Sequence, residues 1–361
     1  MSNMFIHYGN HAQQAAHAVL TPLLARMSVP RHVVLKPNLV VAKPAHTGAT
    51  THAEVAEGVI LALQEWGVSH ISIMEGAWVG DSTRKAFQAG GWDKLAQRYN
   101  CELLDTKADD TLKIDVPQGD LTLQVCRSVW QADMLINLPV LKGHCQTNMT
   151  CALKNLKGCI PDSEKRRFHT LGLHRPIAAL AAAFARHMPV LTVVDALCGD
   201  LSFEEGGHPV VMDRIYAGAD MVQLDAYGAQ LMGLPLSDVR YIQLAQEYGA
   251  GSTTLEADDI QVIGGAPDQQ EFTTPPDLRV FRNQNIHAKD ACSACQGALV
   301  HALYRLSQEG WRPVEPIAVG QGWQGQQQPG MGVGKCCAGF ARHVPGCPPT
   351  AQAIMRLLDE Q

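Results

Sequence analysis

Apolar and polar residues follow one another along the first two-thirds of the chain in two recurring patterns. Short apolar runs rich in β-branched residues predict buried strands at 31–42, 70–76, 101–106, 133–140 and 188–197. Apolar residues spaced three and four apart predict helices at 51–68, 83–100, 175–187 and 219–233. Thr51 and Glu54 have the spacing of a capping box at the start of the first helix. Strands separated by helices predict an α/β fold, with a mostly parallel sheet and helices on both faces.

The pattern changes near residue 285. Residues 290–310 begin with two cysteines and continue as a predicted helix, and residues 350–360 have the spacing of a closing amphipathic helix. Between them the chain is rich in Gly and Gln, and we expect the segment 320–334 to act as a flexible cover over the entrance to a site. We therefore divide the chain into an α/β domain at 1–285 and a small cysteine-rich, cluster-binding unit at 286–361.

Composition narrows the class of protein. The chain has 361 residues, of which 46% are hydrophobic and 18% are charged, enough apolar material for one large or two ordinary domains. A formal charge of −6 and a pI near 6.2 argue against a general nucleic-acid binder. No apolar run approaches the length of a membrane span, and the first residues lack the pattern of a signal peptide. We expect a cytoplasmic protein without a nucleic-acid or membrane partner.

The chain contains eleven cysteines, a high and odd number, and without a secretion signal this argues against a disulfide framework. Cys292 and Cys295 form a CxxC pair at a predicted helix start, where free backbone N–H groups favour thiolate charge. Cys347 lies in the segment Val-Pro-Gly-Cys-Pro-Pro, and a Cys-Pro step recurs beside iron–sulfur ligands. A Gly-rich segment precedes Cys336 and Cys337, and either of these two residues can supply a fourth sulfur ligand.

These cysteines predict a [4Fe–4S] cluster as cofactor, with Cys292, Cys295, Cys336 and Cys347 as its ligands. Zinc also accepts four cysteines, but structural zinc sites usually carry two CxxC pairs and this tail has one. Three further cysteines lie close together in sequence, and buried small side chains, a second metal site and a nucleophile are all open interpretations for them: Cys145, Cys151 and Cys159.

The middle of the chain resembles a known family. The segments that carry the resemblance are Lys36-Pro37-Asn38, Gly48-Ala49-Thr50-Thr51-His52, Leu-Pro-Val-Leu-Lys-Gly-His at 138–144 and Thr-Cys-Ala-Leu-Lys-Asn-Leu-Lys-Gly-Cys at 150–159. They resemble the motifs of the DUF362 family, and segments 193–197 and 218–233 are similar to its later parts. The resemblance covers about residues 33–235 and implies an iron–sulfur centre without implying a reaction. Cys145 departs from the pattern, because a small or hydroxyl residue is expected after His144.

Polar residues at or just after predicted strand ends indicate where a ligand would bind, because an open α/β sheet presents its site at the carboxyl ends of its strands. Any one of them could be a solvent-facing or capping residue, but together with the resemblance they favour a pocket for an anionic small molecule. Proposed catalytic residues, with His144 as a proton shuttle near neutral pH, are Lys142, His144, Lys154 and Asp195. Proposed binding residues are Lys36, Asn38, Asn155, Arg166, Arg167 and His169. The last three belong to the basic stretch 163–175, which is either a solvated face or a loop whose Arg side chains grip a planar anion.

These observations favour an iron–sulfur oxidoreductase. It would pass electrons between the cluster and an anionic small-molecule substrate or second cofactor, with a protein such as ferredoxin as electron donor or acceptor. Two alternatives remain: a non-redox lyase or desulfidase with an open iron, and a non-catalytic assembly or sensor protein. Redox chemistry requires the cluster to lie near the substrate, so the tail should fold back until Cys292, Cys295 and Cys347 face the segment 142–159.

Overall fold

The structure, a computed structural model, describes residues 4–266, 285–313 and 315–359. Its largest feature is an eight-stranded sheet with the strand order β12, β1, β11, β10, β7, β2, β3, β4. These strands are β1 (Met4–Tyr8), β2 (His32–Pro37), β3 (His70–Glu75), β4 (Glu102–Asp105), β7 (Met134–Leu138), β10 (Val190–Asp200), β11 (Pro209–Gly218) and β12 (Ile260–Gly264). Strand β11 pairs antiparallel with both of its neighbours, whereas the other pairs in the sheet are parallel.

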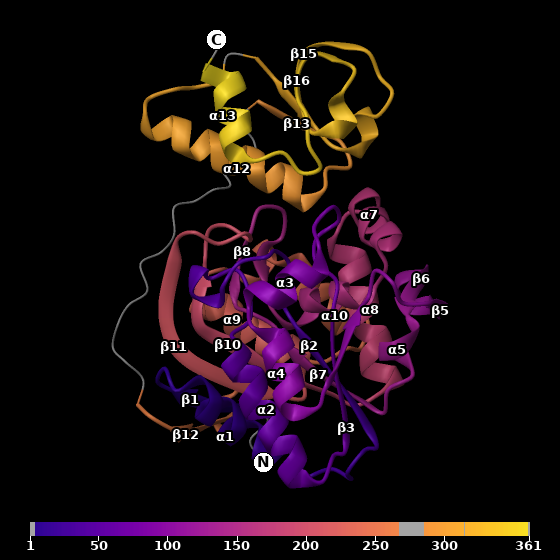
Figure 1. Ribbon diagram of the computed structural model, residues 1–361, viewed down its shortest axis with the longest axis vertical. Helices are drawn as coiled ribbons and strands as arrows, with labels where there is room; N and C mark the ends of the chain where they lie inside the picture. The colour runs from indigo at the N-terminus through magenta and orange to yellow at the C-terminus, as the bar shows by residue number, and fades with distance from the viewer. Residues whose placement is uncertain (1–3, 267–284, 314, 360–361) are drawn as a thin grey trace.

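Helices cover both faces of this sheet, as the sequence predicts (Figure 1). One face packs against α1 (Ala12–Leu24), α2 (Ala53–Trp66), α3 (Thr83–Ala89) and α4 (Trp92–Tyr99). The other packs against α6 (Ala152–Asn155), α8 (His174–His187), α9 (Met221–Leu231) and α10 (Arg240–Glu247), and a hairpin of β5 (Thr111–Val116) and β6 (Leu121–Cys126), followed by α5 (Arg127–Trp130), lies beside them. Side chains of β2 alternate between these two cores, with Val33 and Leu35 in one and Val34 in the other, because successive strand residues point to opposite faces.

Three local predictions are corrected by the structure. The strand predicted at 31–42 ends at Pro37. The helix predicted at 83–100 is two helices, because Gly91 adopts a left-handed conformation with a φ of 73° between them. The capping box is wrong: Thr51 Oγ1 donates a hydrogen bond to the Leu138 carbonyl oxygen at 2.7 Å, so this hydroxyl is engaged by the sheet instead of by the first turn of α2.

Residues beyond 285 form a second, smaller sheet of four parallel strands: β13 (Ile286–Ala288), β14 (Ile317–Val319), β15 (Gln328–Val333) and β16 (Phe340–Val344). Two helices, α12 (Ser293–Gln308) and α13 (Ala351–Asp359), pack against it. They confirm the helices predicted at 290–310 and 350–360, apart from a few residues at the ends. Met331 and Val333 are buried in this core, so the last part of the predicted flexible cover is the interior strand β15. The Gly-rich composition is misleading there because a few apolar side chains suffice to anchor a short strand.

The smaller unit lies over one end of the larger one, next to β8 (Lys142–His144), β9 (Asn148–Thr150) and α7 (Asp162–Thr170) (Figure 1). Gln146, between β8 and β9, donates from Nε2 to the Ala291 carbonyl oxygen at 2.9 Å and to Gln296 Oε1 at 2.8 Å. Ser293 Oγ donates in turn to Gln146 Oε1 at 2.7 Å. These bonds fix the start of α12 against the larger unit. The predicted boundary at 285 borders residues 267–284, which lie outside the described residues.

Within the described part of the chain, no helix is long and apolar enough to cross a membrane.

Candidate functional site

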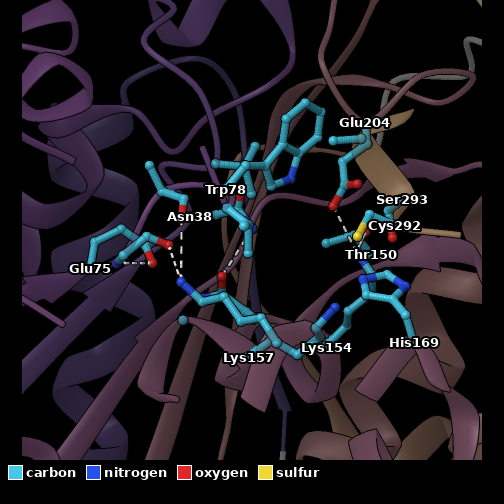
Figure 2. Close-up of a pocket in the computed structure, with 18 of the residues that line it drawn as sticks. Asn38, Glu75, Trp78, Thr150, Lys154, Lys157, His169, Glu204, Cys292 and Ser293 are labelled. Atoms are coloured by element: carbon cyan, nitrogen blue, oxygen red, sulfur yellow. Dashed lines mark hydrogen bonds and ion pairs between the residues drawn. The ribbon is translucent and has the colours of Figure 1, made fainter. Parts of the chain in front are cut away.

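A cavity of about 90 Å³ lies where the carboxyl ends of β2 and β3 meet the segment after β9 and the start of α12 (Figure 2). Its charged and titratable lining residues are Lys36, Glu75, Lys154, Lys157, Lys165, His169, Glu204, Cys292, Cys295 and Cys347. The location agrees with the general position of ligand sites in open α/β sheets. The lining joins lysines from the larger unit to cysteines from the smaller one.

Lys36 and Glu75 form a buried ion pair on one wall. Lys36 Nζ lies 2.8 Å from Glu75 Oε2, and both side chains are almost completely removed from solvent. The backbone N–H groups of Leu39 and Gly76 also donate to this carboxylate, at 2.8 and 2.7 Å. A β-carbon at Gly158 would overlap both side chains of the pair, so a glycine is required where that turn passes them. Lys36 is therefore neutralised within the protein.

Asparagine side chains connect the carboxyl ends of β2 and β7 to α6. Asn38 Nδ2 donates to Asn155 Oδ1 at 2.9 Å, and Asn155 Nδ2 donates to the Lys36 carbonyl oxygen at 3.0 Å. Lys142 Nζ donates to Asn38 Oδ1 at 3.1 Å and to the Glu204 carbonyl oxygen at 2.9 Å. Burial lowers the pKa of Lys142 to about 8. Asn38 and Asn155 line the cavity, whereas Lys142 lies behind them and positions Asn38.

Glu204 connects three neighbouring side chains. Its Oε1 lies 2.7 Å from Lys154 Nζ, and its Oε2 lies 3.0 Å from His144 Nε2. Burial alone would raise the pKa of Glu204, but His144 and Lys154 hold it well below the usual range. His144 Nδ1 accepts hydrogen bonds from the backbone N–H groups of Gln146 and Thr147, both at 3.0 Å, so the proton of the neutral ring resides on Nε2. Burial lowers the pKa of His144 to about 3, consistent with a neutral ring that donates to Glu204.

Lys157 and His169 differ from these groups because the described residues leave them without a partner in the cavity. Lys157 forms no hydrogen bond or ion pair with any described residue, and burial together with the charge of Lys154 lowers its pKa to about 7. His169 Nδ1 is buried and has no hydrogen-bond partner among the described residues. Burial, and next the charge of Lys157, lowers the pKa of His169 well below its usual value, so this imidazole is neutral. Figure 2 draws His169 beside Cys292 and Thr150.

Three of the four predicted cluster ligands line this cavity: Cys292, Cys295 and Cys347. Cys336 does not line it, but its charge contributes to the raised pKa of Cys292, which places the two thiols near one another. Cys337 is completely buried and directs its Sγ to the Ala318 carbonyl oxygen at 3.6 Å, inside a small apolar cluster. Among the described residues, no group of three or more His, Cys, Asp or Glu side chains is arranged to hold a metal ion.

The expectation that Asp195 lies in the same cavity is wrong. Strand β10 continues to Asp200, so Asp195 lies inside the strand instead of at its carboxyl end. Its Oδ2 accepts hydrogen bonds from both the backbone N–H and Nδ1 of His52, each at 2.8 Å. His144 and Lys142 also lie outside the lining, so they position other residues and do not contact a ligand there.

The basic stretch 163–175 is helical up to Thr170, in α7, and its last two residues begin α8, so it is not a single loop. Lys165 and His169 are four residues apart and both reach the cavity, as the helical repeat requires. Arg167 faces elsewhere, because its Nη1 donates to the Thr122 carbonyl oxygen at 2.9 Å and contacts Glu164 Oε1 at 2.6 Å. Arg166 is exposed, although its charge acts on Cys292 and Cys336. The structure therefore does not bring the two arginines together as an anion clamp.

The cysteines at 145, 151 and 159 are buried within the larger unit. Burial raises the pKa of Cys151 well above its usual value and that of Cys159 to about 12, so both are neutral thiols. Cys145 Sγ donates to the Ser293 carbonyl oxygen at 3.5 Å, a contact between the two units. These positions favour the interpretation of buried small side chains over that of a nucleophile.

Sequence reasoning missed two residues of the site. Glu75 is the last residue of β3, so the same strand-end rule that selected Lys36 also applied to it. Lys157 follows Lys154 by three residues, a spacing that puts both on one helical face. The sequence does not indicate that Lys154 pairs with the distant Glu204, or that Lys157 has no counter-ion among the described residues.

Comparison with known proteins gives a family and distant structural likenesses. Thylakoid-associated protein sll1697 of Synechocystis is 25% identical over 234 residues, which cover 62% of this chain and 70% of that protein. The lactate racemase apoprotein from Thermoanaerobacterium thermosaccharolyticum has a TM-score of 0.43 and 12% identity, over 66% of this chain and 58% of that one. A protein from Thermotoga maritima has a TM-score of 0.40 and 11% identity, over 67% and 61%. The family model described as "Domain of unknown function (DUF362)" matches residues 33–230, more than half of the sequence, and this chain therefore belongs to the DUF362 family.

Proposed function

We propose that this protein is an iron–sulfur oxidoreductase that exchanges electrons between a [4Fe–4S] cluster and an anionic small molecule in the cavity. The cluster ligands would be Cys292, Cys295, Cys336 and Cys347. The observation that carries the proposal is the shared lining: three of these cysteines face the same small space as Lys157 and His169. When bound, the cluster would supply one-electron transfer next to the substrate.

The thiols of the proposed ligands lie near one another. Burial raises the pKa of Cys292 to about 11, and the neighbouring charges of Cys336 and Cys347 add to this rise, so Cys292 would lose its proton on binding iron. Lys157 and Arg166 oppose it, so cationic side chains already stand beside the thiols. In a four-iron cluster each thiolate binds a different iron, and the sulfurs need not converge on one point. A single zinc ion would require that convergence, at about 2.3 Å per bond.

The chain's own residues would bind and orient the substrate. Lys157 has no counter-ion among the described residues, and its pKa of about 7 lets it hold a proton beside a bound anion, while the neutral His169 supplies a hydrogen-bonding nitrogen. Trp78 and Val79 also line the cavity and give part of its wall an apolar surface. Gly80, which precedes α3, approaches the Cys347 backbone so closely that a β-carbon there would overlap its carbonyl oxygen. The loop after β3 and the tail thus enclose the cavity from two sides.

The exposed edge of the cluster would accept an electron-carrier protein such as a ferredoxin. Cys347 is exposed, and the exposed side chains of Arg166 and Lys335 both act on Cys336, so a cationic rim lies beside that thiol. Such a rim suits an acidic partner, because complementary charge increases the rate of encounter. We also propose that the protein is located in the cytoplasm.

Anaerobic purification of the full chain tests the proposal. We expect about four irons per chain and a broad visible absorbance that dithionite bleaches. Cys336→Ala should lose iron, whereas Cys337→Ala is the matched control and should keep it, because Cys337 points into an apolar cluster. Stoichiometric zinc without iron would refute the cluster. A full complement of iron that dithionite does not reduce would refute the redox function and favour a lyase or a structural role.

A further inference from the structure

Among the described lysine and histidine side chains that line the cavity, Lys157 and His169 have no partner, whereas the others are paired. Lys36 is matched by Glu75, and Lys154 is matched by Glu204. Lys165 Nζ donates to the Gly76 carbonyl oxygen at 2.9 Å and lies 3.4 Å from Asp162 Oδ1. Lys157 has no such partner among the described residues, and neither does the buried Nδ1 of His169. A ligand is therefore expected at Lys157 and His169 and not at the other lysines.

These two groups are close to one another and act on the same space. Of the charged neighbours of His169, Lys157 has the largest effect on its pKa. His169 comes from α7 and Lys157 from the turn that follows α6, so two separate elements direct a nitrogen into one cavity. A buried polar nitrogen without a partner costs free energy, and a ligand that satisfies it recovers that cost.

The number of unpaired charges indicates the charge of the ligand. Of the four lysines that line the cavity, Lys157 is the one without a carboxylate partner among the described residues, which matches a monoanion better than a phosphate with nearly two negative charges. The remaining wall is apolar and is formed by Val40, Ala77, Trp78 and Val79. The volume of about 90 Å³ is well below the roughly 300–1,000 Å³ of cavities that hold drug-sized ligands. The ligand should be compact, with one charged end and a short hydrocarbon part.

We infer that the cavity binds a short-chain monocarboxylate, with Lys157 Nζ on one carboxylate oxygen and His169 Nδ1–H on the other. The hydrocarbon part would lie against Trp78 and Val79, and the carboxylate end would face the side of the cavity lined by Thr150 and Cys292. This inference names the substrate class of the function proposed above and rests on it for the role of the site. Binding itself requires only the residues that line the cavity.

Isothermal titration of the full-length, anaerobically purified protein tests it, with propionate as probe. Propionamide is the matched neutral probe, and inorganic phosphate is the divalent one. We expect propionate to bind and propionamide not to. Lys157→Met should weaken propionate binding about tenfold or more, as removal of a charge-assisted hydrogen bond does. Lys113→Met, at an exposed position of β5, is the matched control and should bind propionate as the wild type does.

His169 gives a second and independent test. Asn can place a polar atom where Nδ1 lies, so His169→Asn should keep most of the affinity that His169→Leu loses. Equal binding of propionate by Lys157→Met and the wild type, binding of propionamide as strong as that of propionate, or tighter binding of phosphate would each overturn the inference. Iron is measured on the same samples, so loss of iron with retained binding contradicts the proposed function alone, and retained iron without binding contradicts this inference alone.

Discussion

Glu204 offers the sharpest test of the buried charge network behind the cavity. Glu204→Gln keeps the shape of the side chain but removes its charge. Lys154 Nζ, 2.7 Å away, then loses its counter-ion while the positively charged groups of Lys142 and Lys157 remain nearby. Removal of one partner of a buried ion pair typically costs about 3–5 kcal/mol. Because a Gln oxygen can still accept hydrogen bonds, we expect a loss of about 3 kcal/mol in the free energy of unfolding.

Equilibrium urea unfolding, followed by fluorescence and circular dichroism, measures this loss, with coincident transitions as the check for two-state behaviour. Glu65→Gln is the matched control: Glu65 lies 2.8 Å from His17 but is 68% exposed, so its loss should stay below about 1 kcal/mol. The double variant Lys154→Met/Glu204→Gln should lose less than the sum of its single variants, by about 0.5–3 kcal/mol. Equal losses in Glu204→Gln and Glu65→Gln, or additive single variants, would refute the buried-network argument.

Two further predictions concern positions outside the cavity. Gln146→Ala removes the side chain that forms hydrogen bonds with Ala291, Ser293 and Gln296. Amide hydrogen exchange at the start of α12 should therefore become faster, while exchange in β2 stays unchanged. Equal exchange at α12 in the variant and the wild type would contradict this. Burial lowers the pKa of His52, but Asp195 outweighs burial and raises this pKa above 6.5. Protonated His52 therefore stabilises the native state at low pH, and this contribution is lost as the pH rises through the folded-state pKa. The stability difference between the wild type and His52→Gln should therefore shrink as the pH rises above 6.5, and a constant or growing difference would contradict the pairing.

The rule that ligand sites lie at the carboxyl ends of parallel strands identified some residues of the cavity and missed others. Lys36, Asn38, Lys154 and Asn155 line the cavity because the carboxyl ends of parallel strands meet at one edge, a property that follows from strand order alone. The same rule failed for Asp195, since antiparallel pairing with β11 extends β10 beyond it to Asp200. It also treated His144 as a proton shuttle, whereas both of its ring nitrogens are occupied by the backbone and Glu204.

The sequence by itself determined the elements whose signal is local. Apolar periodicity predicted the central strands and most helices, and long motifs predicted the family, because these depend on residues close together in the chain. Only the tertiary structure decided which charges are neutralised: Lys154 meets Glu204 across 50 positions, Lys36 meets Glu75 across 39, and Lys157 meets no described partner. The expected placement of Cys292, Cys295 and Cys347 against segment 142–159 is confirmed, and the structure adds the contacts of Gln146 with α12 that hold them there. Pairing between distant residues depends on how the layers of the fold pack, and this packing cannot be inferred from the periodicity of apolar residues along the chain.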